Sequence, residues 1–463
     1  MNNQTYPPEA GANPAANRSF ACADQPRAAT SFRRACGLLV LTWVLLIHLG
    51  GGLRLSAQTL SPWAVLLCNF KDNQSEPPVP NFKTACQSFF TPAGNGTYNG
   101  VRFFQDMSHG KLDTSGSQVF GWLTVDANTS DILPDSPAAR EKLSDLAMQA
   151  ALGAGIPLFS YDRVAIIPNI IVGGAQGGTW GTIWPMPGIF ADYRYITGGG
   201  TAILGEEMGH AYGLDHPRRD GSTDDYQDKW DGMGALNTWY WSDPVYHGTG
   251  PGFNAWNMRG RGWLDESRVW HGSAAGFSHV VQLRPLYRRD LPGLLAAELP
   301  PNDGVGGHGR YLVEFRTKES WDYGIPRSAV LVHRFEGTIG GWLDSHSYIM
   351  AGTKGQYDLV TGDRFDSTAG ATLEILAIDE VNRTATVRVN YLSEPPARYV
   401  DKYYSGSTVD GSFTHPYKRL LDAYNTANNG DAIFIRTASY TEALPPITKR
   451  LMMDSYLGTS TIY

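Results

Sequence analysis

Short, uninterrupted apolar runs mark the first strands that the sequence predicts. The run WAVLLCNF at 63–70 predicts a buried strand, because it is short, continuous and apolar. The segments 99–111 and 119–125 predict further extended segments with turns between them. The segment 163–172 predicts another strand, and Pro168 places it at a sheet edge or a bulge because proline donates no ladder hydrogen bond.

Two other stretches have a helical pattern. Ser136 can cap a helix and Pro137 fits its first position, so a helix is predicted from there to about residue 152. Its apolar residues recur at helical spacing, and the segment 153–157 ends it. A second helix is predicted at 201–211, directly after a glycine-rich loop.

Beyond residue 270 the pattern changes to short alternating runs separated by turns. The segments 311–315 and 329–333 predict strands, and 373–389 predicts a hairpin whose turn lies near Asn382. Such a pattern is typical of a β-rich, sandwich-like domain. The proline-containing segment 393–396 predicts a linker after this domain.

The first 57 residues have the three parts of an export signal. Arg33 and Arg34 lie near the end of a polar leader, an apolar run covers 37–49, and the small residues Ser56 and Ala57 follow. This run is shorter than the roughly 20 apolar residues of a membrane-spanning helix. We therefore expect a secreted protein that is cleaved after Ala57. The alternative is an uncleaved signal-anchor that holds the protein at the membrane.

Composition and charge narrow the class of protein. A chain of 463 residues is too long for one ordinary core, so two or three domains are expected. With 42% hydrophobic and 18% charged residues, the chain has a globular composition. The net charge of -7 argues against a nucleic-acid-binding protein, because there is no basic surplus to neutralise phosphates.

Cysteine usage agrees with export. Cys22 and Cys36 lie in the leader, which leaves Cys68 and Cys86 in the mature chain. Two cysteines that close a short loop fit one disulfide in an oxidising compartment. The alternative is a pair of buried, unpaired thiols. None of the four cysteines has zinc-finger spacing.

The strongest chemical signal is the sequence GEEMGHAYGLDH. Residues four apart project from the same helix face, so Glu206 and His210 can reach one ion together. Gly213 allows the chain to bend back, which can bring His216 to the same ion as a third ligand. Three protein ligands and one open position suit a hydrolytic zinc centre, and Glu207 beside them can hold the attacking water. The alternative is a solvated glutamate pair with a structural histidine.

The same stretch resembles the metzincin motif H-E-x-x-H-x-x-G-x-x-H at every fixed position except the first, where Glu206 stands. Downstream, the sequence YQDKWDGMG resembles the Met-turn of the gametolysin-like metallopeptidases, with Met233 as the methionine beneath the metal. Weaker similarities occur at 107–112, 120–122, 262–264 and 311–334. The resemblance therefore covers about residues 60 to 390.

This resemblance implies a secreted zinc endopeptidase that acts on proteins or peptides, with extracellular-matrix or cell-wall components among the candidate partners. It implies that Glu207 is the general base and that His210 and His216 bind the metal, with Glu206 as the third ligand. A carboxylate there cuts the net charge at the ion by one unit, which favours harder divalent ions more than a histidine does. The alternative is a catalytically silent, metzincin-like surface binding protein in which Glu206 turns outward.

The last segment of the chain has a different sequence pattern from the rest. Residues 396–463 resemble the cap and first rung of a right-handed parallel β-helix, and a single rung cannot bury its faces alone. The sequence thus predicts four parts in order. These are a leader at 1–57, an α+β metzincin-like catalytic domain at 58–270, a β-sandwich-like domain at 271–395, and a truncated start of a parallel β-helix at 396–463.

Overall fold

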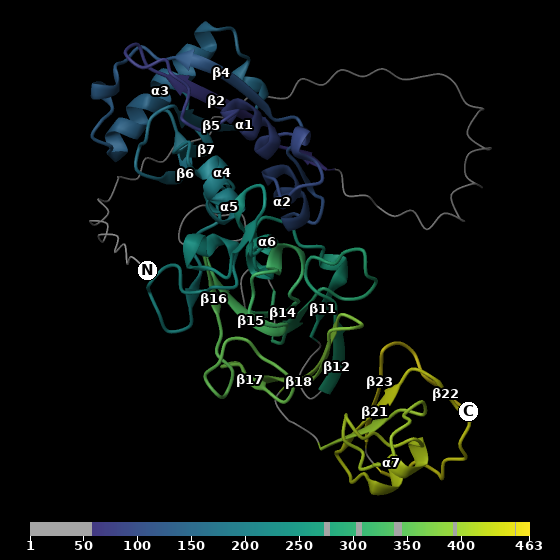
Figure 1. Cartoon of the computed structure of the whole chain (residues 1–463). Coiled ribbons are helices and arrows are strands. Elements are labelled where there is room, and N and C mark those ends of the chain that lie inside the picture. The colour runs from purple at the N-terminus through teal and green to yellow at the C-terminus, as the bar shows by residue number, and fades with distance from the viewer. Residues whose placement is uncertain (1–57, 273–277, 302–307, 338–344, 392–395, 450) are drawn as a thin grey trace, which may run out of the picture. The chain divides into compact units, whose positions relative to one another are not determined.

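The computed structural model describes residues 58–272, 278–301, 308–337, 345–391, 396–449 and 451–463 (Figure 1). It shows a mixed α/β protein with several sheets. The predicted export signal and cleavage site at 1–57, with Cys22 and Cys36, lie outside the described residues, as do positions 393–395 of the predicted linker. All described residues belong to one unit, Leu55–Tyr463.

A five-stranded sheet forms from the apolar runs of the first half of the chain. Its strands lie in the order β4–β2–β5–β7–β6 (Figure 1). Strand β2 spans Trp63–Asn69, β4 spans Gln118–Thr124, β5 spans Arg163–Pro168, β6 spans Ala175–Trp180 and β7 spans Met186–Ala191. The first four strands of the sheet pair in parallel, and β6 pairs antiparallel with β7 at the edge. The predicted strands at 63–70 and 119–125 are confirmed.

Helices cover both faces of this sheet. Alternate side chains of β2 enter two separate apolar clusters, because successive residues of a strand point to opposite faces. One cluster includes residues of α1, α2 and α5, and the other includes residues of α3. In order from α1 to α5, the helices span Phe82–Phe90, Gly100–Met107, Pro137–Gly153, Tyr195–Gly198 and Gly200–Ala211. The two predicted helices are confirmed, and Ser136 caps α3 through the N–H of Ala139 at 3.1 Å.

The extended segment predicted at 99–111 is wrong, because this stretch forms helix α2. Asn99 caps the helix by accepting the N–H of Arg102 at 3.0 Å. Gly110 follows the helix with a φ of 72°, a left-handed conformation that favours glycine. The helix has only eight residues, too few for its apolar period to stand out from an alternating pattern.

The edge position predicted from Pro168 is also wrong. Strand β5 lies at the centre of the sheet, between β2 and β7. Pro168 is the last residue of β5, and the pairing of β5 with β7 already ends at Ile166. The missing N–H of the proline therefore costs no hydrogen bond to β7.

The second half of the chain forms two further sheets that share one apolar cluster. The six-stranded sheet has the order β11–β13–β14–β15–β16–β8, with strands at Val269–His271, Ala296–Leu299, Tyr311–Arg316, Ala329–Glu336, His346–Ile349 and Arg218–Arg219. The four-stranded sheet has the order β12–β19–β18–β17, with strands at Ser278–Leu283, Thr384–Tyr391, Ala371–Asp379 and Arg364–Asp366. The strands predicted at 311–315 and 329–333 and the hairpin near Asn382 are confirmed.

The six-stranded sheet crosses the domain boundary predicted at residue 270. Its edge strand β8 comes from the predicted catalytic segment and pairs in parallel with β16. The apolar cluster beneath α5 also includes Leu312 and Phe335 from the second half of the chain. The two segments therefore share both a sheet and a core, and the boundary itself stays a prediction.

The C-terminal segment contains parallel strand pairs. The strands β20, β21 and β23 form one parallel sheet, and β22 pairs in parallel with β24. Strand β20 spans Ala397–Val400, β21 spans Ala432–Arg436, β22 spans Ser439–Tyr440, β23 spans Met452–Tyr456 and β24 spans Thr461–Ile462. Helix α7 spans Leu420–Thr426. They enclose an apolar cluster of their own.

Short elements complete the fold. Strand β1 (Thr59–Leu60) pairs in parallel with β3 (Leu112–Asp113), and β9 (Trp241–Asp243) pairs antiparallel with β10 (His247–Thr249). Helix α6 (Ala255–Gly260) follows β10 along the chain.

The predicted disulfide between Cys68 and Cys86 is wrong, because both thiols are free and buried. Cys68 belongs to the apolar cluster that includes residues of α3, whereas Cys86 lies on α1 in the cluster on the opposite face of the sheet. The sheet therefore lies between the two sulfur atoms. Burial raises the pKa of the Cys68 thiol to about 12 and also raises the pKa of Cys86.

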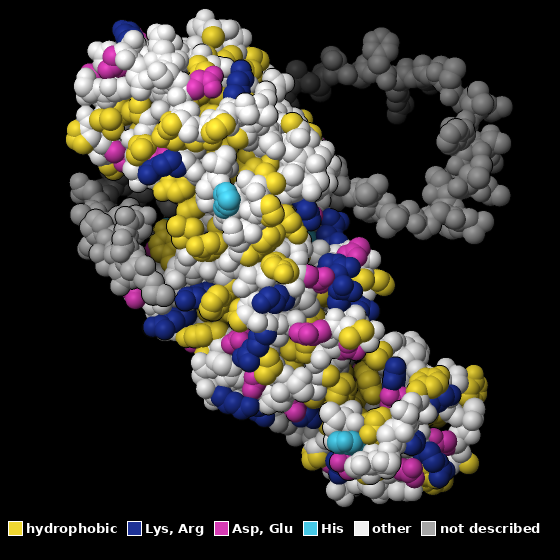
Figure 2. Space-filling model, in the orientation of Figure 1, with side chains coloured by type: hydrophobic (Ala, Val, Ile, Leu, Met, Phe, Trp, Pro, Cys, Tyr) yellow, Lys and Arg dark blue, Asp and Glu magenta, His cyan; other side chains and the backbone are white. Residues whose placement is uncertain are grey.

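Hydrophobic and charged side chains are unevenly distributed on the face of the described residues that Figure 2 shows. On the face that Figure 2 shows, hydrophobic side chains are frequent over the part that contains α5 and the five-stranded sheet. Lysine, arginine, aspartate and glutamate side chains are more frequent over the six-stranded sheet. No described helix has both the length and the apolar character that a membrane crossing requires.

Candidate metal centre

Helix α5 carries two of the predicted ligands one turn apart. Glu206 and His210 lie four residues apart, so both side chains project from the same side of the helix. A Cβ on Gly209 would lie 2.4 Å from Sδ of Met233, so this glycine lets the methionine pack directly against the helix. The helix can therefore hold its ligands close to the Met-turn.

The chain reverses direction directly after α5. Gly213 has a φ of 81°, in the left-handed region where a Cβ would be costly. Its N–H donates to the carbonyl of His210 at 2.8 Å, and the N–H of Leu214 donates to the carbonyl of Gly209 at 3.0 Å. These bonds end the helix and return His216 to the face that carries Glu206, as the spacing predicted.

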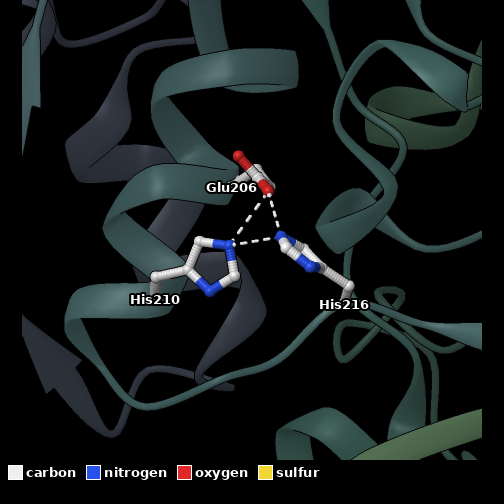
Figure 3. Close-up of side chains that lie close together, drawn as sticks. All are labelled: Glu206, His210 and His216. Atoms are coloured by element: carbon white, nitrogen blue, oxygen red, sulfur yellow. Dashed lines mark hydrogen bonds and ion pairs between the residues drawn. The ribbon is translucent and has the colours of Figure 1, made fainter. Parts of the chain in front are cut away.

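The three predicted ligand side chains converge on one point (Figure 3). Nε2 of His210 lies 3.0 Å from Oε1 of Glu206 and 2.9 Å from Nε2 of His216. Nε2 of His216 lies 3.3 Å from the same oxygen of Glu206. Glu206 is only 3% exposed and faces both imidazoles, so the outward-turned arrangement is not the one adopted.

This arrangement fits a divalent cation. Ligand atoms held about 2.0–2.2 Å from a tetrahedral ion lie about 3.3–3.6 Å from one another. The three atoms here already lie 2.9–3.3 Å apart and need to separate only slightly to admit an ion. Two imidazole nitrogens and one carboxylate oxygen form a donor set that zinc accepts in hydrolytic centres.

Polar contacts around the centre orient both imidazoles. Nδ1 of His210 lies 2.8 Å from the carbonyl oxygen of Leu214, and Nδ1 of His216 lies 3.4 Å from Oδ2 of Asp225. Arg218 holds the other oxygen of Asp225 at 2.8 Å. Because Nδ1 of each ring is engaged, Nε2 is left to face the ion position.

In the ion-free protein, the protonation of Glu206 depends on the charges of the two histidines, and the protonation of His210 depends on Glu206. Burial raises the pKa of Glu206, but the hydrogen bonds and positive charges of His210 and His216 outweigh burial and lower it. Burial lowers the pKa of His210, but the hydrogen bond and charge of Glu206 outweigh it and raise the pKa to about 9. A cation therefore competes with a proton for His210 at neutral pH.

Glu207 lies between the helix and the edge of the five-stranded sheet. Its Oε2 accepts the N–H of Gly177 on β6 at 2.5 Å. Burial and the negative charge of Glu206 raise the pKa of Glu207 well above its ordinary value. A Cβ on Gly177 would lie 2.0 Å from the carbonyl oxygen of Glu207, so only glycine lets β6 approach α5 this closely.

Met233, the residue of the predicted Met-turn, packs against helix α5. Met233 has no solvent exposure and belongs to the apolar cluster that includes Met208 of α5. The side chain of Asp231 accepts the N–H of Met233 at 2.8 Å and fixes the start of the turn. The structure therefore brings Glu206, Glu207, His210, His216 and Met233 into one region.

Three contacts at this centre have no signal in the sequence. Gly177 lies in a glycine-rich strand 30 residues before Glu207. Asp225 lies in a polar loop, and His346 lies 130 residues after His216, whose carbonyl oxygen it contacts. Only the fold brings these residues to the motif.

Comparison with known proteins assigns this chain to no family. A scan of the sequence against protein-family models finds no match, and a search of curated proteins finds no match either. The chemistry of the site is therefore argued from its geometry and from the motif.

Proposed function

We propose that this chain is a secreted, metal-dependent endopeptidase. The observation that carries the proposal is the convergence of Glu206, His210 and His216, whose ligand atoms lie within 3.3 Å of one another. Zn²⁺ is the ion that this donor set suits best, and the carboxylate of Glu206 also admits another divalent ion. We also propose that residues 58–270 are metzincin-like and that 396–463 begin a parallel β-helix.

The residues around the ion position have separate tasks in this proposal. A divalent cation bound there supplies Lewis acidity, which polarises a peptide carbonyl and makes water more acidic. Glu207 accepts the proton of the attacking water at its carboxylate and passes it to the leaving amine. The N–H of Gly177 holds that carboxylate against α5, so its position is fixed before substrate binds.

The edge strand β6 offers a binding surface for an extended peptide. It is the terminal strand of its sheet, so one side of its backbone pairs with β7 and the other side faces away from the sheet. The N–H of Gly177 reaches Glu207, so this outer side leads to the candidate base. A peptide that added to this edge would pass the base with both of its ends free, which favours cleavage within a chain over removal of terminal residues.

A shallow pocket lies beside the same helix. It has a volume of about 250 Å³ and is lined by Arg194, Tyr195, Gly198, Gly199, Ile203 and Leu236. Ile203 lies one helical turn before Glu207, and Leu236 follows the Met-turn. The pocket therefore borders the helix that carries the candidate base.

Hydrolysis of unfolded casein tests the proposal. We expect cleavage that stops with 1,10-phenanthroline and continues with the non-chelating isomer 1,7-phenanthroline. We expect Glu207→Ala to lose roughly 10²–10⁴-fold in rate, the usual contribution of a general base. Glu380→Ala, at an exposed glutamate of the β18–β19 turn, is the matched control. Cleavage that survives both 1,10-phenanthroline and Glu207→Ala would exclude this chemistry.

A second candidate function is a silent surface binding protein. The observation that favours it is that Glu206 bonds both imidazoles, so the trio is satisfied without an ion. This candidate predicts little zinc binding by the wild type and a gain of activity in Glu206→His. It is excluded if the wild type cleaves casein and Glu206→His cleaves no faster.

A further inference from the structure

The third candidate ligand lies next to the six-stranded sheet, whereas the first two lie on helix α5. One residue, Pro217, separates His216 from strand β8, and β8 pairs in parallel with β16. Arg218 is paired with Tyr348, and the N–H of Asp220 donates to the carbonyl of Ile349 at 3.0 Å. Glu206 and His210 are fixed by their helix, whereas His216 depends on how this segment is anchored.

His346, the first residue of β16, contacts the ligand segment directly. Its Nδ1 lies 3.1 Å from the carbonyl oxygen of His216, and its Nε2 lies 3.6 Å from Oδ2 of Asp215. The carbonyl can only accept, so Nδ1 of His346 carries the proton and donates it. The side chain is 11% exposed, so water competes weakly for these contacts.

Neighbouring side chains extend the same anchor. Arg334 of β15 lies over the ring of Tyr348, with its guanidinium carbon 4.5 Å from the ring centroid, and contacts Asp220 at 3.1 Å. On the other side, Arg218 of β8 bonds Asp225, which in turn contacts Nδ1 of His216. The backbone of His216 and its ring are therefore both held by residues of the six-stranded sheet or their direct partners.

We propose that His346 is a positioning residue of the metal centre, through which strand β16 sets the place of His216. The proposal rests on the proposed function in one respect, which is that His216 is a metal ligand. Without His346, the segment that carries His216 is held at β8 and through Asp225 but loses the contact to the backbone carbonyl of His216. The centre then keeps the two ligands of α5 and binds its ion more weakly.

The zinc dissociation constant of the full chain tests this role, measured in competition with a chromophoric chelator. We expect His346→Ala to weaken binding about 10–100-fold, the usual effect of removing a partner that orients a ligand. We expect His346→Asn to bind within about threefold of wild type, because its amide N–H can replace the Nδ1–H donor. His279→Ala, which removes a partly buried histidine on β12, is the matched control and should bind as wild type does.

Hydrogen exchange of the ion-free protein tests the positioning separately from the metal. We expect amides of 216–220 to exchange at least tenfold faster in His346→Ala than in wild type, with the rate restored in His346→Asn. Unchanged exchange in His346→Ala overturns the positioning role, even if zinc binds. Faster exchange with no zinc binding by the wild type shows that His346 holds the segment of His216. It excludes zinc as the ion of the proposed function and overturns a role for His346 in zinc binding. Zinc binding equal to wild type in His346→Ala overturns this inference and leaves the proposed function intact.

Discussion

His333 Nε2 lies 2.9 Å from Asp228 Oδ2, and neither side chain has any solvent exposure. His333 belongs to β15, whereas Asp228 lies five residues before Met233 and accepts the N–H of Trp230 at 2.8 Å. The pair therefore ties the six-stranded sheet to the turn beneath the candidate metal centre. Buried ion pairs of this kind contribute little net stability, but removal of one partner is costly because the other stays buried and unpaired.

The buried side chains of Asp231 and His333, which lie close to Asp228, predict that the protein loses stability as pH rises. Burial and the charge of Asp228 raise the pKa of Asp231 from 3.8 to about 7. Burial lowers the pKa of His333, but the charge of Glu314 and the bond to Asp228 outweigh it and raise the pKa above 6.5. Both groups bind a proton on folding, so their contribution is full below their unfolded pKa values and is lost as pH rises through the folded ones.

Denaturant unfolding of the ion-free protein at pH 5, 7 and 8.5 measures this effect. The free energy of unfolding should fall over this range, and the fall should be smaller in Asp231→Asn. The asparagine cannot titrate, and it also removes a charge that raises the pKa of His333. Equal slopes in the two proteins would show that this group does not take up protons on folding.

Glutamine substitutions separate the ligand carboxylate from the base. Glu206→Gln keeps an oxygen near the ion position but removes the negative charge, so zinc affinity should fall at least tenfold. Glu207→Gln should change zinc affinity less than threefold while casein hydrolysis falls roughly 10²–10⁴-fold. Isothermal titration with zinc and casein assays on both variants measure the two effects. The assignment of roles is reversed if Glu207→Gln is the variant that loses zinc.

Gly177 should tolerate no larger residue. In Gly177→Ala the new Cβ would lie 2.0 Å from the carbonyl oxygen of Glu207 and 2.6 Å from Cβ of His210, so β6 must move away from α5. We expect a loss of about 1–3 kcal/mol in stability, typical of overpacking, and a larger fractional loss of activity. Gly153→Ala is the matched control, because its Cβ would meet no atom within 4 Å. Thermal melting and casein hydrolysis distinguish the two variants.

The free thiols should be unreactive in the folded protein. Cys68 and Cys86 are both fully buried, and burial raises both pKa values, so little thiolate forms at pH 8. Iodoacetamide should label neither position in the native protein and both after unfolding in guanidinium, as read by peptide mass spectrometry. A 68–86 disulfide peptide in the non-reduced digest would contradict the separation of the two cysteines by the sheet.

Many elements of the fold and of the candidate site could be predicted from local patterns in the sequence. The apolar run at 63–70, the cap at Ser136 and the fixed spacing from Glu206 to His216 each depend on neighbouring residues alone. The spacing works because a helical turn and one glycine bend determine where three side chains point. Metzincin identity, export and the solenoid stay predictions.

Features that depend on distant residues could not be predicted in this way. The central position of β5 follows from which strands flank it, and Pro168 gives no sign of that. The failure of the 68–86 disulfide follows from the sheet between the cysteines. His346 reaches the candidate metal centre because β8 joins β16, a pairing that no local sequence pattern predicts. Asp225 is held there by Arg218 of β8. Helix α2 was missed because it is too short for its period to be distinctive.

The pairing of β8 with β16 has a consequence for biosynthesis. His216 and His346 are separated by 130 residues, so the strand that anchors the third ligand leaves the ribosome long after the ligand itself. Closing so large a loop is slow compared with forming a helix. A nascent chain therefore carries Glu206, His210 and His216 for many seconds before strand β16 is available to anchor the segment of His216.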